Sequence, residues 1–256
     1  MLKQKILNGE KTIAMHHNLT DIGVAKIIGL AGYDFIWIDM EHSYFSYETL
    51  LEHIIAIQAT GTPVVVRVPQ DDLTATKKIL EMGVDGIIFP MVKNADEANR
   101  LIAMTLYPPY GNRGFGPINA IDYGFKDAKE YVDHNHEKMC RFIQIEHKEA
   151  VEDLDEIIKN PYIDGYILGP CDLSGSYDMM NDVYSEKISD VIRGVVDKLH
   201  KAGKYVGLAT GDIRIEVLEH WKSMNIDMMA AGADFDYMRI MAIENCKNLE
   251  RLYKGI

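Results

Sequence analysis

The sequence has few cysteines, no long hydrophobic run and fewer basic than acidic residues. Cys140, Cys171 and Cys246 show no CxxC spacing, so neither a disulfide framework nor a cysteine zinc cluster is expected. No apolar run approaches the ~20 residues of a membrane-spanning helix. The N-terminus also lacks the apolar segment of a signal peptide. We therefore expect a soluble cytoplasmic protein.

The charge of the chain limits its partners. Acidic residues outnumber basic ones by 39 to 27, which gives a formal net charge of −12. Nucleic acids are bound by basic faces, so neither nucleic acid nor a membrane is expected as a partner. A small anionic substrate stays possible, because one arginine or metal ion can dominate the charge of a single pocket.

Short apolar runs alternate with amphipathic segments along the whole chain. Eight strands, each followed by a helix, are typical of a closed (β/α)8 TIM barrel. An open doubly wound sheet is the alternative, and the count of eight favours closure. No linker or low-complexity segment interrupts the pattern, so residues 1–256 are expected to form a single domain. The expected strands are Thr12–Met15, Phe35–Asp39, Val64–Val68, Gly86–Phe89, Arg141–Ile145, Gly165–Leu168, Tyr205–Ala209 and Met228–Ala231. The expected helices are Asp21–Ala31, Tyr47–Ala59, Leu73–Met82, Ala95–Leu106, Glu149–Lys159, Glu186–Ala202, Arg214–Met224 and, beyond the last strand, Phe235–Tyr253.

Charged or imidazole side chains follow several of the expected strands directly. They are Asp39 at the end of the second expected strand with Glu41 and His42 after it, Arg67 after the three valines of the third, Glu146 after the fifth and Asp172 shortly after the sixth. The carboxyl ends of barrel strands meet at one face, where the active sites of barrel enzymes are built. The sequence therefore predicts an enzyme site at this face.

Glu146 and Asp172 follow the fifth and sixth strands, which are neighbours in a barrel. Two carboxylates that converge on one pocket repel each other unless a proton or a cation lies between them. An all-oxygen pair suits Mg²⁺ or Mn²⁺ better than zinc, which prefers histidine or cysteine. Each acid alone could merely cap the helix that follows, but the two together favour metal ligation.

Three further features at the expected strand ends indicate substrate binding or catalysis. A guanidinium at Arg67 would be costly to bury unless it faced an anion in the pocket or formed an ion pair with Asp39. His42 lies beside two acids, which suits an acid–base group near neutral pH. The turn Gly169–Gly175 offers backbone amides to a substrate carboxylate. The acidic neighbours of Cys171 argue against a nucleophilic thiolate there.

Other candidates are weaker. His16 and His17 follow the first expected strand, so one of them could line the pocket, but they lack metal-ligand spacing. No expected strand contains an interior lysine, which argues against Schiff-base chemistry. Asp234 begins the last helix and is expected to be its N-cap. The long connection from Tyr107 to about Gly124 is typical of a lid or binding loop.

Five short motifs occur in a characteristic order. They are Asp39-Met40-Glu41-His42, Val66-Arg67-Val68-Pro69, Tyr107-Pro108-Pro109 with Arg113-Gly114-Phe115-Gly116, Gln144-Ile145-Glu146, and Gly169-Pro170-Cys171-Asp172-Leu173-Ser174. In this order they resemble the motifs of the HpcH/HpaI aldolases, which are metal-dependent (class II) pyruvate aldolases of the phosphoenolpyruvate/pyruvate barrel superfamily. The resemblance extends from about Gly23 to Ala233.

The resemblance implies roles for individual residues. Glu146 and Asp172 would hold a divalent metal ion (Mg²⁺, Mn²⁺ or Co²⁺), Arg67 would stabilise a pyruvate enolate and His42 would transfer protons. Glu81 stands where the family often has an aspartate partner of the catalytic histidine. The residues implied to bind substrate or to orient the site are Asp39, Gln144, Gly169, Cys171, Asp172, Ser174 and Arg113.

The implied activity is reversible aldol cleavage of a 4-hydroxy-2-oxo acid, such as a 2-keto-3-deoxy sugar acid, to pyruvate and an aldehyde. The stretch Ile121–Gly124 lacks the arginine of relatives that act on acidic aldehydes, which favours a neutral, hydroxylated aldehyde. The alternatives are other enolate chemistry (oxaloacetate decarboxylase, macrophomate synthase-like or acyl-CoA lyase) and a non-catalytic metabolite-binding barrel. Family members are usually hexamers, so the helix 235–253 is expected to pack on a neighbouring subunit.

Overall fold

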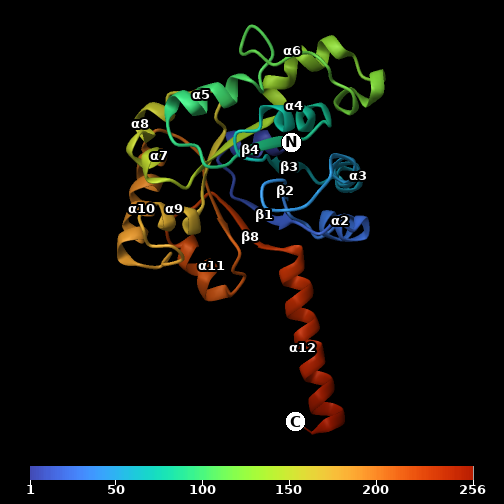
Figure 1. The fold of residues 1–256 in the computed structure, drawn as a ribbon, viewed down its shortest axis with the longest axis vertical. Coiled ribbons are helices and arrows are strands. Elements are labelled where there is room, and N and C mark those ends of the chain that lie inside the picture. The colour runs from blue at the N-terminus through green and yellow to red at the C-terminus, as the bar shows by residue number, and fades with distance from the viewer. Residues whose placement is uncertain (256) are drawn as a thin grey trace.

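The computed structural model describes residues 1–255 and contains a closed barrel of eight parallel strands. Each strand pairs with the next along the chain, and β8 pairs with β1 to close the ring. The barrel and its ring of helices are seen in Figure 1. The expected (β/α)8 fold is therefore confirmed. The strands are β1 (Thr12–His17), β2 (Phe35–Asp39), β3 (Val64–Arg67), β4 (Gly86–Phe89), β5 (Cys140–Ile145), β6 (Gly165–Leu168), β7 (Val206–Thr210) and β8 (Met228–Ala233).

The helices cover the outside of the barrel, and most of them match the expected ranges within a few residues. They are α1 (Leu2–Leu7), α2 (Ile22–Gly29), α3 (Tyr47–Gln58), α4 (Leu73–Glu81), α5 (Ala95–Ala103), the 3₁₀ segment η1 (Asn119–Gly124), α6 (Ala128–Lys138), α7 (Lys148–Glu152), α8 (Leu154–Ile157), α9 (Pro170–Ser176), α10 (Glu186–Lys201), α11 (Ile215–Lys222) and α12 (Asp234–Lys254).

Four elements were not expected from the apolar pattern: α1, η1, α6 and α9. Helix α6 has Asn135 as its one buried residue, so it carries no apolar stripe from which a helical period could be recognised. The single helix expected over Glu149–Lys159 is instead divided into α7 and α8 at Asp153. The side chain of Asp153 accepts a hydrogen bond from the backbone nitrogen of Ala95, which ties this break to the start of α5.

Alternate residues of the strands face two different cores. In β2, Phe35 and Trp37 belong to the cluster inside the barrel, whereas Ile36 and Ile38 pack against the surrounding helices. Buried parallel strands are apolar on both faces, which is why β2 reads as a continuous apolar run. Leu2 and Ile6 of α1 belong to the inner cluster and close the end of the barrel where the strands begin.

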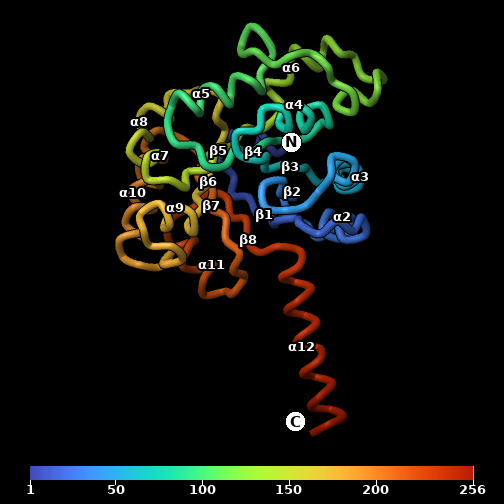
Figure 2. Tube along the Cα trace, viewed as in Figure 1, coloured from blue at the N-terminus to red at the C-terminus, as the bar shows by residue number. Residues whose placement is uncertain are grey.

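Helix α12 extends away from the barrel, as Figures 1 and 2 show. Its buried residue is Asp234, at the first turn. Large apolar side chains along the rest of the helix are exposed: Phe235, Met238, Met241, Ile243, Leu249, Leu252 and Tyr253. The expected extra C-terminal helix is thus present. Within residues 1–255, no helix combines the length and apolar character needed to cross a membrane.

Candidate active site

A pocket of about 410 Å³ opens at the barrel face where the strands end. Residues at or just beyond the carboxyl ends of β1, β2, β3, β5, β6 and β7 meet there, as the strand-end argument predicts. Seven of the predicted site residues line it: His42, Arg67, Gln144, Glu146, Gly169, Cys171 and Asp172. The lining residues are His16, His42, Arg67, Gln144, Glu146, Gly169, Pro170, Cys171, Asp172, Val183, Tyr184, Ala209, Thr210, Gly211, Asp212 and Trp221.

Asp39 and Arg67 form an ion pair at the base of this site. The strand register places Asp39 directly beside Arg67. Arg67 Nη2 donates to Asp39 Oδ2 at 2.6 Å, and Arg67 Nε donates to Oδ1 at 2.9 Å. Burial alone would raise the pKa of Asp39, but Arg67 and the backbone nitrogens of Glu41 and His42 outweigh burial and lower this pKa. The carboxylate therefore stays ionised and holds the guanidinium in place.

Arg67 also links the second strand to the fifth. Its Nη1 lies 3.2 Å from Glu41 Oε2 and donates to Gln144 Oε1 at 3.4 Å. The amide nitrogen of Gln144 donates in turn to Glu146 Oε2 at 2.7 Å. Because Gln144 accepts from the arginine and donates to the acid, the orientation of its side-chain amide is fixed. These contacts form one connected network across the pocket.

Glu146 is a buried carboxyl group whose two oxygens are both engaged. The backbone nitrogen of Met91 donates to Oε1 at 2.7 Å, and Gln144 donates to Oε2. Burial, reinforced by the charge of Asp172, raises the pKa of Glu146 to about 8. A Cβ atom at position 169 would lie 2.4 Å from Glu146 Oε2, so only glycine leaves room for the carboxyl group. The glycine of the Gly169-Pro170 turn is thus required by its acidic neighbour.

The donor set suits a hard divalent cation. Asp172 lies in the first turn of α9 and lines the same pocket as Glu146. Two carboxylates with space for water or substrate oxygens match the preference of Mg²⁺ and Mn²⁺. Burial and the charge of Asp172 raise the pKa of Glu146, and a cation bound between the two acids would favour their ionised forms. Within residues 1–255 no group of three or more histidine, cysteine or acidic side chains is arranged to bind a metal, so substrate and water would complete the shell.

His42 reaches the pocket from the segment after β2. Its side chain is 65 % exposed, and its Nε2 lies 3.7 Å from Glu41 Oε2. Burial raises the pKa of Glu41. An accessible imidazole beside an acid suits proton exchange with a bound substrate.

Two predicted site residues lie elsewhere in the chain. Glu81 ends α4 just before β4 begins, at the opposite end of the barrel from His42. It forms a 3.4 Å ion pair with Arg113, which is buried and stacks over the ring of Tyr107. The structure does not bring Glu81 to His42 within the chain. The predicted roles of Glu81 in catalysis and of Arg113 in substrate binding therefore stay predictions.

Ser174 and Cys171 differ in position. Ser174 is buried, and its hydroxyl donates to the carbonyl oxygen of Cys171 at 2.7 Å, which stabilises the first turn of α9. Cys171 lines the pocket, and burial together with the charge of Asp172 raises the pKa of its thiol. A raised pKa disfavours the thiolate.

The two adjacent histidines lie within β1 rather than after it, because that strand continues to His17. His16 lines the pocket, whereas His17 is fully buried. The Nδ1 atom of His17 lies 2.6 Å from Asp234 Oδ2, and its Nε2 lies 2.6 Å from His53 Nδ1. Asp234 was expected to be the N-cap of the last helix, but it is the first helical residue and its carboxylate binds His17.

The pocket also contains residues that the sequence did not single out: Tyr184, Thr210 and Asp212. Thr210 ends β7 and Asp212 lies two residues further on, so the position of both at a strand end could have indicated them. Tyr184 comes from the loop between α9 and α10 and stacks on Trp221 with ring centroids 5.6 Å apart. No sequence pattern near Tyr184 indicates a site residue, because only the fold brings this loop to the pocket.

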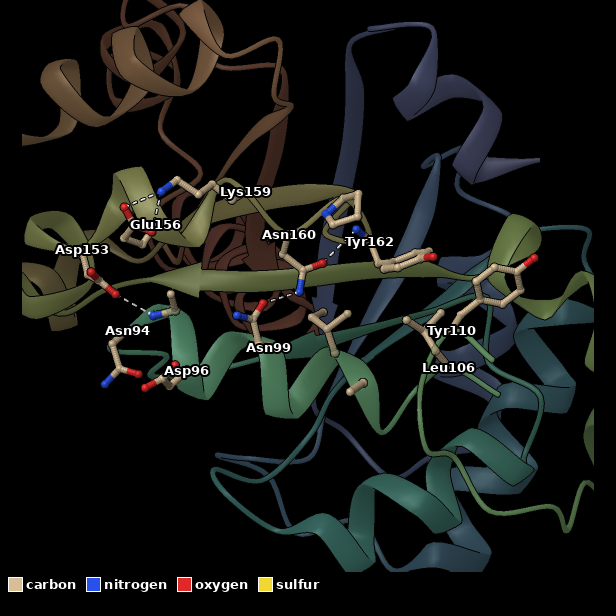
Figure 3. A pocket seen from close by; sticks show the side chains of 14 residues that line it. Asn94, Asp96, Asn99, Leu106, Tyr110, Asp153, Glu156, Lys159, Asn160 and Tyr162 are labelled. Carbon is tan, nitrogen blue, oxygen red and sulfur yellow. Dashed lines mark hydrogen bonds and ion pairs between the residues drawn. The ribbon is translucent and has the colours of Figure 1, made fainter. Parts of the chain in front are cut away.

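A larger hollow of about 590 Å³ lies on the outside of the barrel between α5 and α8. Figure 3 shows it lined by polar side chains such as Asn99 and Asn160, which point toward each other. Asn160 donates to Asn99 at 2.7 Å, and Lys159 pairs with Glu156. These side chains bind one another, and the hollow contains none of the predicted site residues. The candidate site is therefore the smaller pocket at the barrel mouth.

The fold and this pocket define the class of the protein: a (β/α)8-barrel enzyme with an arginine and two acids at the carboxyl ends of its strands. Residues 13–234 match the family model described as HpcH/HpaI aldolase/citrate lyase, and the chain belongs to this family. It is thus an aldolase or lyase of the HpcH/HpaI type.

Individual proteins are similar to this chain in sequence or in fold. The chain is 28 % identical over 232 residues to a 2-keto-3-deoxy-L-rhamnonate aldolase from Escherichia coli O6:K15:H31, a match that covers 91 % of this chain and 86 % of the relative. A solved HpcH/HpaI aldolase/citrate lyase family protein from Burkholderia cenocepacia J2315 superimposes with a TM-score of 0.90 at 24 % identity, covering 97 % and 98 % of the two chains. Macrophomate synthase shares the fold with a TM-score of 0.83 at 22 % identity, covering 98 % of this chain and 89 % of the other.

Proposed function

We propose that this protein is a metal-dependent pyruvate aldolase that cleaves a 2-keto-3-deoxy sugar acid, or a similar 4-hydroxy-2-oxo acid, to pyruvate and a neutral aldehyde. The observation that carries the proposal is the buried carboxyl group of Glu146, which shares the pocket with Asp172 and is joined to Arg67 through Gln144. The name of the relative from Escherichia coli supports a sugar-acid substrate.

Glu146 and Asp172 would hold the divalent ion. When bound, such an ion polarises the 2-oxo group of the substrate and favours enolate formation at C3. The pyruvate half would then lie between these acids and Arg67.

The residues of the chain account for the remaining requirements of cleavage. His42 takes the proton from the C4 hydroxyl group, the C3–C4 bond breaks, and its electron pair forms the enolate of pyruvate while the aldehyde is released. Arg67, held by Asp39, offsets the negative charge that develops on the enolate oxygen. Return of the proton held by His42 to C3, through solvent water, completes the formation of pyruvate and restores the neutral imidazole.

Assembly is part of the proposal. The exposed apolar side chains of α12 form a surface that the barrel of the same chain does not cover. Burial of this surface against another subunit would remove it from water. We therefore include a homo-oligomer, with a hexamer as the expected size.

The test is pyruvate release from 2-keto-3-deoxy acids, measured with a coupled dehydrogenase. Activity should disappear after exhaustive EDTA treatment and return with Mg²⁺, Mn²⁺ or Co²⁺. Full activity after metal removal, or borohydride trapping of pyruvate on a lysine, would contradict the class II assignment. Binding of 2-oxo acids with no turnover under any metal would favour a non-catalytic barrel.

A further inference from the structure

Two histidines that the proposed reaction does not use lie buried beside the start of α12. They are His17 on β1 and His53 on α3, and both side chains are fully buried. Nδ1 of His17 lies 2.6 Å from Asp234 Oδ2, and Nε2 of His17 lies 2.6 Å from His53 Nδ1. The three side chains therefore form a continuous chain of hydrogen bonds from α12 through β1 to α3.

Asp234 fixes one end of this chain. Burial alone would raise the pKa of Asp234, but the hydrogen bonds from His17 and from the backbone nitrogen of Leu19 outweigh burial and lower this pKa. The carboxylate is therefore ionised and can only accept, so Nδ1 of His17 carries a hydrogen. Asp234 is also the buried residue of α12. The first turn of α12 thus sets the orientation of the His17 ring.

Phe45 connects the histidine pair to the loop between β2 and α3. The centroid of its ring lies 5.5 Å from that of His17 and 5.1 Å from that of His53, which it meets edge-on. Burial lowers the pKa of His53, which favours a neutral imidazole beside this apolar ring. Phe45 is itself buried and directly precedes Ser46, the N-cap of α3. The end of the loop is therefore packed on the two imidazoles.

The same loop carries His42, the acid–base group of the proposed reaction. The side chain of His42 is 65 % exposed and lies 3.7 Å from Glu41, so its position depends mainly on the backbone of residues 40–46. Asp39 holds the first part of this loop, because its Oδ1 accepts from the backbone nitrogens of Glu41 and His42 at 3.0 Å and 3.4 Å. Phe45 holds the last part.

Packing alone does not account for two histidines at these positions. Burial of a polar ring costs free energy, and a pair of apolar side chains of similar shape would fill the same space without that cost. Hydrogen bonds are directional, so the bonds of His17 to Asp234 and His53 fix the angle of each ring. The histidine pair thus provides a rigid surface for Phe45.

We infer that His17 and His53 are positioning residues for His42: anchored by Asp234, they hold Phe45 and with it the loop that carries the acid–base group. This inference rests on the proposed aldolase function. A misplacement of about 1 Å at a catalytic group can lower a rate by about 10²-fold. Loss of this support should therefore slow the step that needs His42 and leave the shared enolate chemistry intact.

The experiment measures pyruvate release from a 2-keto-3-deoxy acid and decarboxylation of oxaloacetate by the same variants. Phe45→Ala and His53→Leu remove the support. His53→Gln is the conservative variant, because its side-chain amide can still donate to Nε2 of His17. Phe45→Ala and His53→Leu are also each combined with His42→Ala, which completes two double-mutant cycles.

The matched controls lie on α10, away from this loop. His200→Leu removes a histidine that pairs with Asp227 at 2.8 Å, and Leu199→Ala truncates a fully buried side chain. Both controls can lower the melting temperature, but the ratio of cleavage to decarboxylation should stay as in the wild type.

Phe45→Ala and His53→Leu should each lower kcat for cleavage by about ten- to hundredfold and change decarboxylation by less than about threefold. His53→Gln should keep cleavage within about threefold of the wild type, because the bond to His17 persists. In the His42→Ala background neither support variant should lower cleavage further, since the group that they position is gone. If Phe45→Ala does not fold, His53→Leu gives the same comparison.

Three results would overturn the inference while leaving the aldolase assignment intact. The first is an additive cycle, in which Phe45→Ala or His53→Leu lowers cleavage as much in the His42→Ala background as in the wild type. The second is an equal loss of both activities, and the third is full cleavage in His53→Leu. Failure of the proposed function would look different: the wild type would release no pyruvate from any 2-keto-3-deoxy acid with any of the three metals, and both conclusions would fall.

Discussion

Asp39 and Arg67 are paired through both the strand register and their side chains. The two residues are partners between β2 and β3, and two hydrogen bonds of 2.9 Å and 2.6 Å join the guanidinium to the carboxylate. Such a two-point contact fixes the plane of the guanidinium, which a lysine could not reproduce. The arginine that would stabilise the enolate is thus positioned before substrate binds.

Replacement of this arginine should affect every reaction that passes through a pyruvate enolate. Arg67→Ala is expected to slow aldol cleavage and oxaloacetate decarboxylation alike, by the ~2.7–4 kcal/mol that is typical for loss of one oxyanion stabiliser. Steady-state kinetics on the two substrates would check this. An Arg67→Ala enzyme that loses only one of the two activities would exclude a role at the shared enolate.

Replacement of His42 should separate the two reactions. Only cleavage must remove a proton from the C4 hydroxyl, so His42→Ala should lower cleavage by about 10²–10⁴-fold and largely spare decarboxylation. The exposed His134 offers a control substitution, His134→Ala, that should change neither. Equal losses in both activities would mean that His42 positions the metal or the pyruvate half instead.

Glu81→Gln tests whether Glu81 assists His42, although the two residues do not meet within one chain. If Glu81 assists His42, this variant should show a weaker form of the histidine defect, with cleavage reduced more than decarboxylation. If Glu81 serves only to pair with Arg113, the variant should lower the melting temperature and leave the ratio of the two activities unchanged. The ratio measured beside a thermal melt decides between these outcomes.

Glu146 should make the metal-free protein less stable as the pH rises. Its pKa is raised to about 8 by burial, whereas an unfolded glutamate has a pKa of about 4.3. Between these values the unfolded chain binds fewer protons than the folded one, so the free energy of unfolding falls with increasing pH. Glu146→Gln should remove this part of the pH dependence. Urea denaturation of the metal-free proteins between pH 5 and pH 8 would show it as a difference of the order of a few kcal/mol.

The apolar face of α12 should control assembly. Met241 is 60 % exposed and Leu252 is 78 % exposed, so the double substitution Met241→Glu and Leu252→Glu should leave the barrel folded but yield smaller species in light scattering. Lys247→Glu on the same helix is the control for added negative charge and should assemble as the wild type does. A monodisperse wild-type monomer would refute the proposed oligomer.

The sequence by itself determined the barrel and predicted the face at which the candidate site lies. Runs such as Phe35–Asp39 are apolar on both faces because a parallel strand is covered by side chains inside and helices outside, and this local pattern is readable without a structure. The polar residues that end those runs, Arg67 and Glu146 among them, were located for the same reason. Helix α6 was not predicted, because its buried residue is Asn135 and it therefore has no apolar stripe.

Only the tertiary structure decided which site residues contact one another. The chain from Arg67 through Gln144 to Glu146 depends on strand register, and the approach of Tyr184 depends on the course of a loop. The same holds for Asp234, which the sequence marks as a helix start and the fold places against His17. Hydrogen bonds between residues far apart in the chain depend on distances that no local period encodes, so the contact of His16 Nδ1 with the carbonyl oxygen of Gly232 forms only when the barrel closes.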